Sequence, residues 1–448
     1  MITYSSIQKS QLEGAIRLDA EYYQPEYLEL MKRLEVLPIV KLSDIAYITD
    51  GEHGSPIFDE TSEIKYFSAQ HVRDGFIDGS DAKSISKIID DRNKRSRLQI
   101  GDILLSTVGT IGFAGLVTED LLPANIDRHV ARIALKDKTI YPGFLVAFLN
   151  SAYGKFQTIR ESTGNVQLNL FIDKIKKLKI PKINAASISN LINTSLEESK
   201  NSKEYFRNAE NLLLEELGIK DLQVEDDVSY VVNLSDIKSA NRVDAEHFQL
   251  KYDKLIAKIK NQNLQPLLKV IENVPARFNP VTKPDTVFHY VELADINASI
   301  GIVDGCSDVS GKEAPSRAKR LLRKGDVIVS SVEGSLEKVA LVRDYQDGYL
   351  ASTGFFQFRS KELLPEVILV LAKSMVMQWQ LQKYCAGTIL TAVPGDSLQK
   401  MFTPVISEPM QQKIADLVRQ SHEARKKSKA LLEEAKRKVE EMIEKRKN

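Results

Sequence analysis

The feature that most constrains this chain is an internal repeat with a long period. Residues 17–27 read RLDAEYYQPEY, and residues 242–252, about 225 positions later, read RVDAEHFQLKY. A period of this length indicates a duplicated domain and not a solenoid. The correspondence continues downstream in the same order, in three further pairs of segments: KYFSAQHVRDG (65–75) with FHYVELADINA (288–298), GDILLST (101–107) with GDVIVSS (325–331), and TGNVQLNL (163–170) with AGTILTAV (386–393). We therefore expect two copies of one unit, roughly 1–225 and 226–448.

The composition agrees with a chain of several globular domains. The 448 residues are 43% hydrophobic and 27% charged, as in ordinary soluble proteins of two to four domains. No apolar run approaches the ~20 residues that span a bilayer, and no signal peptide is apparent at the N-terminus. The only two cysteines fit a reducing compartment. These observations predict a cytoplasmic protein.

Each copy predicts a mixture of helices and short strands. Amphipathic helices are expected at about 21–35 and 246–260, and GDILLST and GDVIVSS each predict a turn followed by a strand. Residues 142–157 and 365–380 predict further amphipathic helices, each with a proline near its start. The expected class is α+β, with two tandem globular domains related by a pseudo-twofold axis.

A long charged helix is expected after each globular part, over 185–217 and 408–444. Leu191, Tyr205 and Leu212 follow a 3–4 spacing with small residues between them, as do Leu417 and Leu431. Such helices, each roughly 50 Å long at ~1.5 Å per residue, either pack on their own units or pair with each other. Pairing as an antiparallel coiled-coil spacer buries more of each apolar stripe, so we expect it. The predicted domains are 1–184 and 220–406, with spacer helices at 185–219 and 407–448.

Catalytic and metal-binding motifs are absent from the sequence. GCSDVSGKE (305–313) resembles a phosphate-binding loop, but its glycines are separated by five residues where four are needed, and Glu313 stands at the position of the magnesium-binding Ser or Thr. The chain lacks the motifs of S-adenosylmethionine-dependent methyltransferases. Two cysteines and six scattered histidines give no zinc spacing, so we expect neither catalysis nor a metal.

Two kinds of segment remain as candidate DNA-binding sites: loops rich in Gly and small polar residues, and basic runs that precede each Gly-Asp turn. Polar side chains can read base edges, and Arg and Lys can hold phosphates. The framework residues match between the copies, whereas the loop contents differ, as two readers of different sequences would require. The candidates in the first copy are Glu52, His53, Ser55, Arg92, Lys94, Arg95, Arg97, Thr107, Thr110, Gln167 and Asn169. Those in the second copy are Arg317, Lys319, Arg320, Arg323, Ser331, Glu333, Ser335, Lys338 and Thr388.

Taken together, these segments resemble the specificity subunits of Type I restriction–modification systems. The resemblance is carried by GDILLSTVGTIGFAGLV, TGNVQLNLFIDKIKKLKIP and the terminal LVRQSHEARKKSKALLEEA. TGNVQLNL looks like the segment that closes a recognition domain in that family, and AGTILTAV departs from it. The resemblance covers nearly the whole chain, including the duplication.

The resemblance implies a non-catalytic subunit that reads a split, asymmetric DNA target with one domain for each half. It implies two methylation subunits docked on the helical spacer, which Leu191, Tyr205, Leu212, Leu417 and Leu431 would mark, and restriction–translocation subunits in the complete complex. The chain itself would bind no cofactor, since S-adenosylmethionine would bind the methylation subunit. A coiled-coil scaffold for other proteins and a stand-alone, two-headed DNA-binding regulator remain as alternatives.

Overall fold

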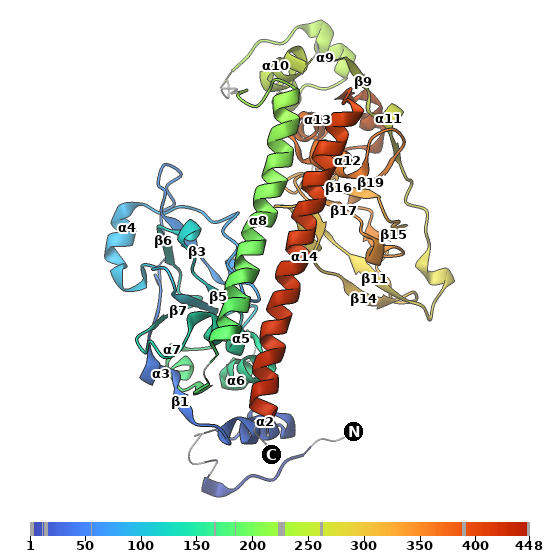
Figure 1. The fold of residues 1–448 in the computed structure, drawn as a ribbon. Coiled ribbons are helices and arrows are strands. Elements are labelled where there is room, and N and C mark those ends of the chain that lie inside the picture. Colours follow the sequence, from blue (N-terminus) through green and yellow to red (C-terminus); the bar gives the residue numbers. More distant parts are fainter. Residues whose placement is uncertain are drawn as a thin grey trace. The chain divides into compact units, whose positions relative to one another are not determined.

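A computed structural model shows a chain that alternates helices with short strands, as expected for the α+β class (Figure 1). No helix in the described part of the chain is long and apolar enough to cross a membrane. The structure describes residues 4–10, 12, 17–54, 56–164, 167–183, 185–222, 229–259, 263–387 and 391–445.

The chain divides into two compact units, and both are built from separate parts of the sequence. The first unit comprises Met1–Ser199 and Lys426–Asn448, and the second comprises Lys200–Arg425. Each unit therefore includes part of each of the two long helices. The predicted recognition-domain boundaries, which assign each long helix to a spacer, stay a prediction.

The first unit contains the sheet β2-β7-β4-β5 and two separate strand pairs, β1 with β8 and β3 with β6. Its strands are β1 Ile39–Lys41, β2 Ala46–Asp50, β3 Lys65–Phe67, β4 Ile103–Ser106, β5 Ala114–Leu116, β6 Ala124–Ile126, β7 Val130–Leu135 and β8 Lys179–Pro181. Its helical segments are η1 Ala20–Tyr23, α2 Pro25–Glu35, α3 Leu42–Ile45, η2 Ala69–His71, α4 Lys87–Arg92, η3 Lys94–Ser96, η4 Glu119–Leu121, α5 Pro142–Asn150, α6 Ala152–Glu161 and α7 Ile172–Ile175.

The four-stranded sheet of this unit is buried on both faces. Side chains alternate between faces along a strand, so Ile103 and Leu105 of β4 lie in one apolar cluster with helix α5, while Leu104 lies in a second cluster with Phe67 of β3. This arrangement explains why GDILLST carries an unbroken apolar run and no polar alternation.

The second unit repeats this plan with additional strands. Its sheets have the orders β10-β19-β16-β17-β13-β12 and β14-β11-β18-β15, with β9 and β20 as a separate pair. Its strands are β9 Leu264–Pro266, β10 Ile271–Asn273, β11 Val287–Val291, β12 Ile296–Asn297, β13 Ile302–Val303, β14 Ser307–Ser310, β15 Ala318–Leu321, β16 Val327–Ser330, β17 Val339–Leu341, β18 Leu350–Ser352, β19 Phe355–Ser360 and β20 Phe402–Pro404. Its helical segments are α9 Leu234–Ala240, η5 Ala245–Phe248, α10 Leu250–Ile259, α11 Leu267–Val270, η7 Pro280–Thr282, η8 Leu293–Asp295, η9 Asp344–Gln346, α12 Pro365–Lys373, α13 Met375–Tyr384 and η10 Gly395–Lys400.

The strand pairings of the two units correspond one to one over the shared elements. β3 pairs with β6 in parallel, as β11 pairs with β18. β4 lies between β5 and β7, as β16 lies between β17 and β19. Strands β12 to β15 have no counterpart among the named strands of the first unit, where isolated bridges such as Lys65 with Ser84 and Val72 with Ile77 occur instead.

The repeated opening phrase forms the same structure in both units. Arg17 binds Asp19 through two hydrogen bonds of 2.8 and 2.6 Å, and Arg242 binds Asp244 through two bonds of the same lengths. Arg17 also donates to the carbonyl of Arg160, 3.1 Å away. Asp19 makes no cap bond to the 3-10 helix that follows it. The pair therefore anchors the entry of the chain to a later helix and does not cap a helix.

The predicted helices at 142–157 and 365–380 are each broken into two. Ser151 and Ser374 adopt extended backbone angles between α5 and α6 and between α12 and α13. The Ser151 hydroxyl donates to the carbonyl of Phe148 at 2.6 Å, a bond that competes with continuation of the helix. The prediction of amphipathic helices was also wrong for α5, because Gly143 to Asn150 are all buried.

The long helices extend from Ala186 to Glu216 (α8) and from Glu408 to Glu444 (α14). Within the first unit, Ser195 donates to the carbonyl of Ser428 at 2.8 Å. Within the second unit, Ser421 donates to the carbonyl of Ser202 at 2.7 Å. In each unit, the parts of the two helices therefore lie side by side and antiparallel, and they also pack on that unit's core.

The predicted stripe is buried at some positions, among them Ile188, Ala209 and Ile414, and is displaced by one residue at others. Leu191, Tyr205, Leu212, Leu417 and Leu431 are only half-buried. Their C-terminal neighbours are buried instead: Ile192, Phe206, Leu213, Val418 and Leu432. The small residues between them include Ser195, Ser202, Ser421 and Ser428, which are all buried.

Candidate nucleic-acid interface

The candidate site of the first unit is an open cleft of about 880 Å³ lined mainly by polar side chains. It lies where the ends of several strands meet the segment at 163–170. The residues that line it are Asp50, His53, Ser68, Ala69, Gln70, Arg73, Thr107, Val108, Gly109, Thr110, Arg128, His129, Gln167, Asn169, Leu170, Phe171 and Ile172.

Backbone hydrogen bonds hold the wall of the cleft in place. The Thr107 amide donates to the carbonyl of His129 at 3.0 Å, and the Leu170 amide donates to the carbonyl of Thr107 at 2.9 Å. Thr107 thereby joins the end of β4 both to the segment before β7 and to the segment at 163–170. Its own side chain is buried.

A closed loop projects Gln167 and Asn169 toward the cleft. The Thr163 amide donates to the Asn169 carbonyl at 2.9 Å, and the Asn169 amide donates to the Thr163 carbonyl at 2.8 Å. Gly164 has a φ of +140°, and a β-carbon there would lie 2.2 Å from the carbonyl oxygen of Gln167. Glycine is therefore required for closure of this loop.

The second unit builds the same loop with different side chains. Ala386 and Ala392 exchange amide-to-carbonyl bonds of 2.9 and 3.0 Å, and the Val393 amide donates to the carbonyl of Ser331 at 2.8 Å. Ala392 stands where the first unit has Asn169, and Gly387 also has a positive φ of 131°. The two units share a frame, and the side chains on that frame differ.

Charged groups of both signs surround the cleft of the first unit. Asp50 binds His53 at 2.8 Å and Arg95 at 3.1 Å. Arg128 donates from Nε to Nε2 of His129 at 3.2 Å, whereas Arg73 makes no ion pair among the described residues. Amides, hydroxyls and guanidinium groups in one cleft match the chemistry of base edges and phosphates.

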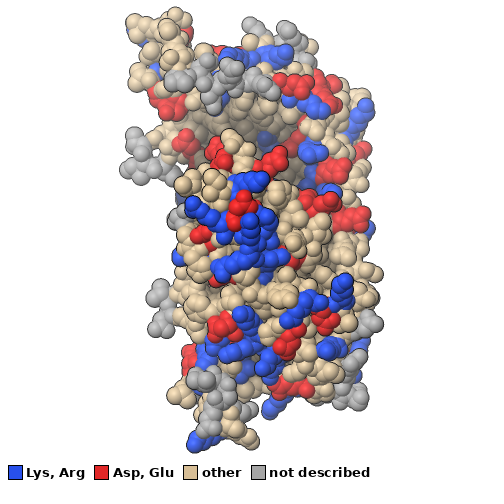
Figure 2. Space-filling view, turned by 90° about the vertical axis from the view of Figure 1, so that its left-hand side faces the viewer, with Lys and Arg blue, Asp and Glu red and all other residues tan. Residues whose placement is uncertain are grey.

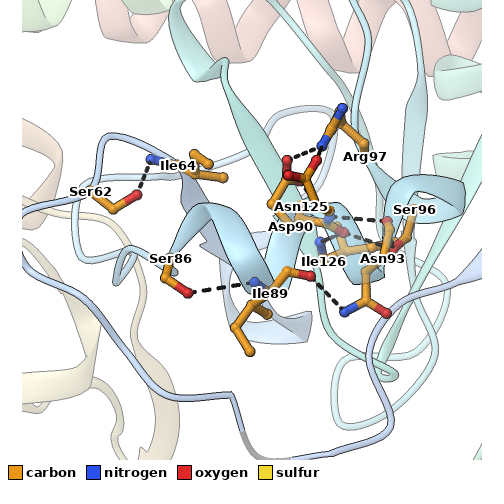
Figure 3. A network of polar contacts seen from close by, with 11 residues as sticks. Ser62, Ile64, Ser86, Ile89, Asp90, Asn93, Ser96, Arg97, Asn125 and Ile126 are labelled. Atoms are coloured by element: carbon orange, nitrogen blue, oxygen red, sulfur yellow. Dashed lines mark hydrogen bonds and ion pairs between the residues drawn. The ribbon is translucent and has the colours of Figure 1, made fainter.

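A buried polar network supports the basic run at 91–97 (Figure 3). Asn125 is fully buried, accepts from the Ser96 hydroxyl at 2.7 Å and donates to Asp90 at 2.9 Å. Arg97 in turn binds Asp90 and Asp91. Arg97 is therefore committed to holding α4 and η3 in place, although it was a candidate for phosphate contact.

Basic side chains also gather on the outer face of this unit. Figure 2, which looks onto the side of Figure 1 where α4 lies, shows Lys and Arg grouped there with Asp and Glu among them. Arg92 and Lys94 are exposed at the end of α4 and the start of η3. Their placement leaves them accessible to a phosphate backbone.

The candidates of the second unit divide into exposed and internally bonded side chains. Arg317, Lys319, Arg323 and Glu333 are exposed. Arg320 is buried, donates to the carbonyl of Val274 at 2.7 Å, and has its pKa lowered to about 10 by burial.

The polar candidates that follow β16 are bonded to nearby carbonyls. The hydroxyl groups of Ser331 and Ser335 donate to Gly354 and Val332 at 2.9 and 3.0 Å. The Lys338 ammonium group lies 3.4 Å from the carbonyl of Ile296.

The structure brings together five of the sequence candidates and separates others. His53, Thr107, Thr110, Gln167 and Asn169 line one cleft. The side chain of Glu52 lies outside that lining and accepts from Asn93. Ser55 and Thr388 lie outside the described residues. A role in DNA contact remains a prediction for all of these residues.

Sequence reasoning missed six polar residues of the cleft: Asp50, Ser68, Gln70, Arg73, Arg128 and His129. Ser68 follows β3 directly, and Asp127 follows β6. These two strands are parallel neighbours, so the segments after them meet at one edge of the sheet. The polar runs SAQH (68–71) and DRH (127–129) can be read from the sequence, but the pairing of β3 with β6 that brings them together cannot.

Comparison with known proteins gives one curated match and several solved structures. No protein-family profile matches the chain. The specificity subunit of the Type I restriction enzyme EcoBI from Escherichia coli is 36% identical over 110 residues. This match covers 25% of the chain and 23% of that subunit, so it spans less than a quarter of the relative's length.

The structural likenesses are weaker. The S subunit of a Type I restriction–modification system from M. genitalium is 14% identical, with 91% of this chain and 95% of that chain covered and a TM-score of 0.40. The HsdS subunit of Thermoanaerobacter tengcongensis is 13% identical, with 91% and 96% covered and a TM-score of 0.29. At these scores the likenesses support no conclusion of their own.

Proposed function

We propose that this chain, which is 36% identical over 110 residues to the specificity subunit of the Type I restriction enzyme EcoBI, is itself such a subunit and reads a bipartite DNA target. Each unit would recognise one half of the target, and the long helices would set the gap between the halves. The chain would be the non-catalytic recognition subunit of a larger, cytoplasmic complex.

The observation that carries this proposal is the closed loop that recurs with different contents. Thr163 and Asn169 close it in the first unit, and Ala386 and Ala392 close it in the second, through the same pair of backbone bonds. The role of a scaffold does not require a repeated loop backbone with different side chains. Two domains that read different half-sites require the shared backbone and the different side chains.

The cleft of the first unit supplies groups suited to direct readout. Gln and Asn side chains can bind adenine through two hydrogen bonds, and Arg can bind guanine in the same way. Gln70, Gln167 and Asn169 offer such amides, and Arg73 and Arg128 offer guanidinium groups. Hydroxyl groups of Ser68 and Thr110 complete a set that can form hydrogen bonds with several bases.

The proposed partners follow from the balance of charge. With 62 basic and 61 acidic residues, the chain has a net charge of +1, which is low for a protein that binds DNA alone. We therefore propose that two methylation subunits, each with its own S-adenosylmethionine, supply much of the phosphate contact. Restriction–translocation subunits would join this complex to cut unmodified DNA.

Selection from random-sequence DNA tests the proposal directly. The purified chain would be mixed with a random library, alone and together with its methylation subunit, at several salt concentrations. We expect enrichment of two short defined segments separated by an unspecified gap, with tighter binding when the methylation subunit is present.

The outcomes distinguish the alternatives. A bipartite motif selected by the chain alone, and unaffected by the methylation subunit, would favour a stand-alone regulator. Capture of the methylation subunit without any enriched DNA sequence in either state would favour a scaffold.

A further inference from the structure

Three potential metal ligands lie together on one sheet of the second unit. They are His289 on β11, Cys306 just before β14, and Asp308 within β14. One ligand atom from each lies within 4.8 Å of the ligand atoms of the other two. All three side chains are exposed, so a cation can reach them without opening the core.

The strand geometry explains why these residues share a face. His289 and Asp308 are directly opposite each other in the antiparallel pair of β11 and β14, and opposite residues project to the same side. Cys306 and Asp308 are two positions apart, so their side chains also point to one side. The ligands come from two strands, and no short sequence motif reveals them.

Contacts around the cluster hold two of the ligands in position. Nδ1 of His289 lies 2.6 Å from the Asp308 carboxylate. The ring of Tyr349 lies against the imidazole of His289, with the ring centres 4.7 Å apart. Cys306 adds a thiol to this group, which a simple cross-strand pair of His and Asp would not need.

We propose that His289, Cys306 and Asp308 bind a zinc-class divalent cation, with a fourth position open to water. Thiolate and imidazole ligands favour zinc and its relatives over magnesium and calcium, which prefer oxygen. Bonds of ~2.0–2.3 Å would place the ligand atoms roughly 3.3–3.7 Å apart in a tetrahedral site. His289 and Asp308 would move slightly apart and Cys306 would move inward, which exposed side chains can do by rotation.

The metal would fasten β14 and the segment before it to β11. β11 corresponds to β3 of the first unit, and β3 leads into Ser68 and Gln70 of the cleft. The cation would therefore stabilise the strand that leads to the equivalent position in the second unit, η8. This inference does not depend on the proposed DNA recognition.

Cobalt titration tests the site on the full chain. The reduced protein would be freed of metal by a chelator and titrated with Co²⁺, which absorbs in the near ultraviolet when a thiolate binds it. We expect this absorption to saturate at one equivalent of cobalt and to disappear when Zn²⁺ is added. Cys306→Ser should abolish it, and His289→Ala should weaken binding by roughly tenfold or more, as loss of even an indirect ligand contact often does.

Matched variants separate the proposed site from adventitious binding. His53→Ala removes an exposed histidine from the other unit and should leave the titration unchanged, and far-ultraviolet circular dichroism would check that each variant folds. Absence of the absorption in the wild type, or its persistence in Cys306→Ser, would overturn the proposal. Equal cobalt affinity in His289→Ala and the wild type would also overturn it, because the thiol would then bind without the cluster.

Discussion

Gln167 is exposed at the cleft of the first unit, and the bonds that close its loop use its backbone carbonyl and not its side chain. Gln167→Ala should therefore leave stability unchanged and weaken discrimination at one base pair of one half-site. A well-placed amide contributes about 1–3 kcal/mol of discrimination, which corresponds to roughly 5-fold to 160-fold in relative affinity. Competition binding with the wild-type target and single-base variants would measure it.

Gln99→Ala provides the matched control for this substitution. Gln99 is also an exposed glutamine of the first unit, and it does not line the cleft. Its replacement should change neither affinity nor base preference. If both variants lowered affinity for all sequences equally, Gln167 would not be a base-reading residue.

His422 is a buried residue of α14 in the second unit and donates from Nε2 to the carbonyl of Ile300 at 2.8 Å. Burial, reinforced by Arg343, lowers the pKa of His422 to about 3. Below about pH 6.5, His422 is protonated in the unfolded state but stays neutral in the folded state. The contribution of neutral His422 to the free energy of unfolding is therefore fully present above about pH 6.5, and it is lost as the pH falls toward about 3.

Urea unfolding would measure this pH dependence through the single tryptophan, Trp379, which belongs to the second unit. Between about pH 7.5 and about pH 5.5, the wild type should lose about 1.4 kcal/mol more stability than His422→Gln, which cannot titrate. Equal losses in both proteins would show that His422 takes up its proton as readily in the folded state as in the unfolded state, which would contradict its burial.

At the residue level, the sequence located side chains whose position depends on the local loop. Gln167 and Asn169 were chosen from the sequence alone and line the cleft, while their contact with DNA stays a prediction. Arg97 and Arg320 were chosen for their charge, but both bind groups elsewhere in their own unit, Asp90 and the carbonyl of Val274. Spacing in the sequence could not reveal those partners.

At the scale of elements, the paired helices depend on small side chains at their contact. Ser421 is fully buried and donates to the carbonyl of Ser202, so the two helix backbones approach closely there. Ser421→Leu would force a larger side chain into this contact and should destabilise the second unit by about 1–3 kcal/mol. Urea unfolding followed by Trp379 fluorescence would measure the change.

Gln420→Leu, at the neighbouring exposed position, introduces the same leucine side chain outside the contact. It should alter the free energy of unfolding by less than about 0.5 kcal/mol, as surface substitutions usually do. A similar loss in both variants would mean that the helices do not pack through Ser421.

Sequence periodicity predicted the long helices, but it placed several of their large apolar contacts one residue too early. Both Leu191 and Ile192 are apolar, as are Leu417 and Val418, so a 3–4 spacing alone fits either choice. The core of each unit decides between them, because Ile192 and Val418 face the apolar clusters. The break at Ser151 was missed for a similar reason. A serine alone does not predict a helix break, and the bond from its hydroxyl to the carbonyl of Phe148 is visible only in the structure.

At the scale of the whole molecule, the proposed function has the two long helices set the distance between the half-sites. Four residues inserted into each helix, after Ser199 and after Arg425, would fall at the boundary between the units and leave each core intact. The insertion adds ~6 Å at ~1.5 Å per residue. The gap between half-sites should lengthen by roughly two base pairs at ~3.4 Å each, while the half-site sequences stay the same.

The duplication was the whole-molecule feature most accessible to sequence reasoning, because collinear matches such as GDILLST and GDVIVSS need no structure to be seen. The sequence did not show that each unit is built from two separate parts of the chain. Each unit includes part of both long helices, whereas boundaries drawn from the sequence place each helix in a single segment.

Methylome sequencing is the most direct test of the central claim. The gene would be expressed with its methylation subunit in a host that lacks other adenine methylation, and every modified adenine would be mapped. We expect one asymmetric motif of two defined parts separated by a fixed, unspecified gap, and Gln167→Ala should relax only one of the two parts. A continuous motif, or methylation that is independent of this chain, would contradict the assignment of one reader to each unit.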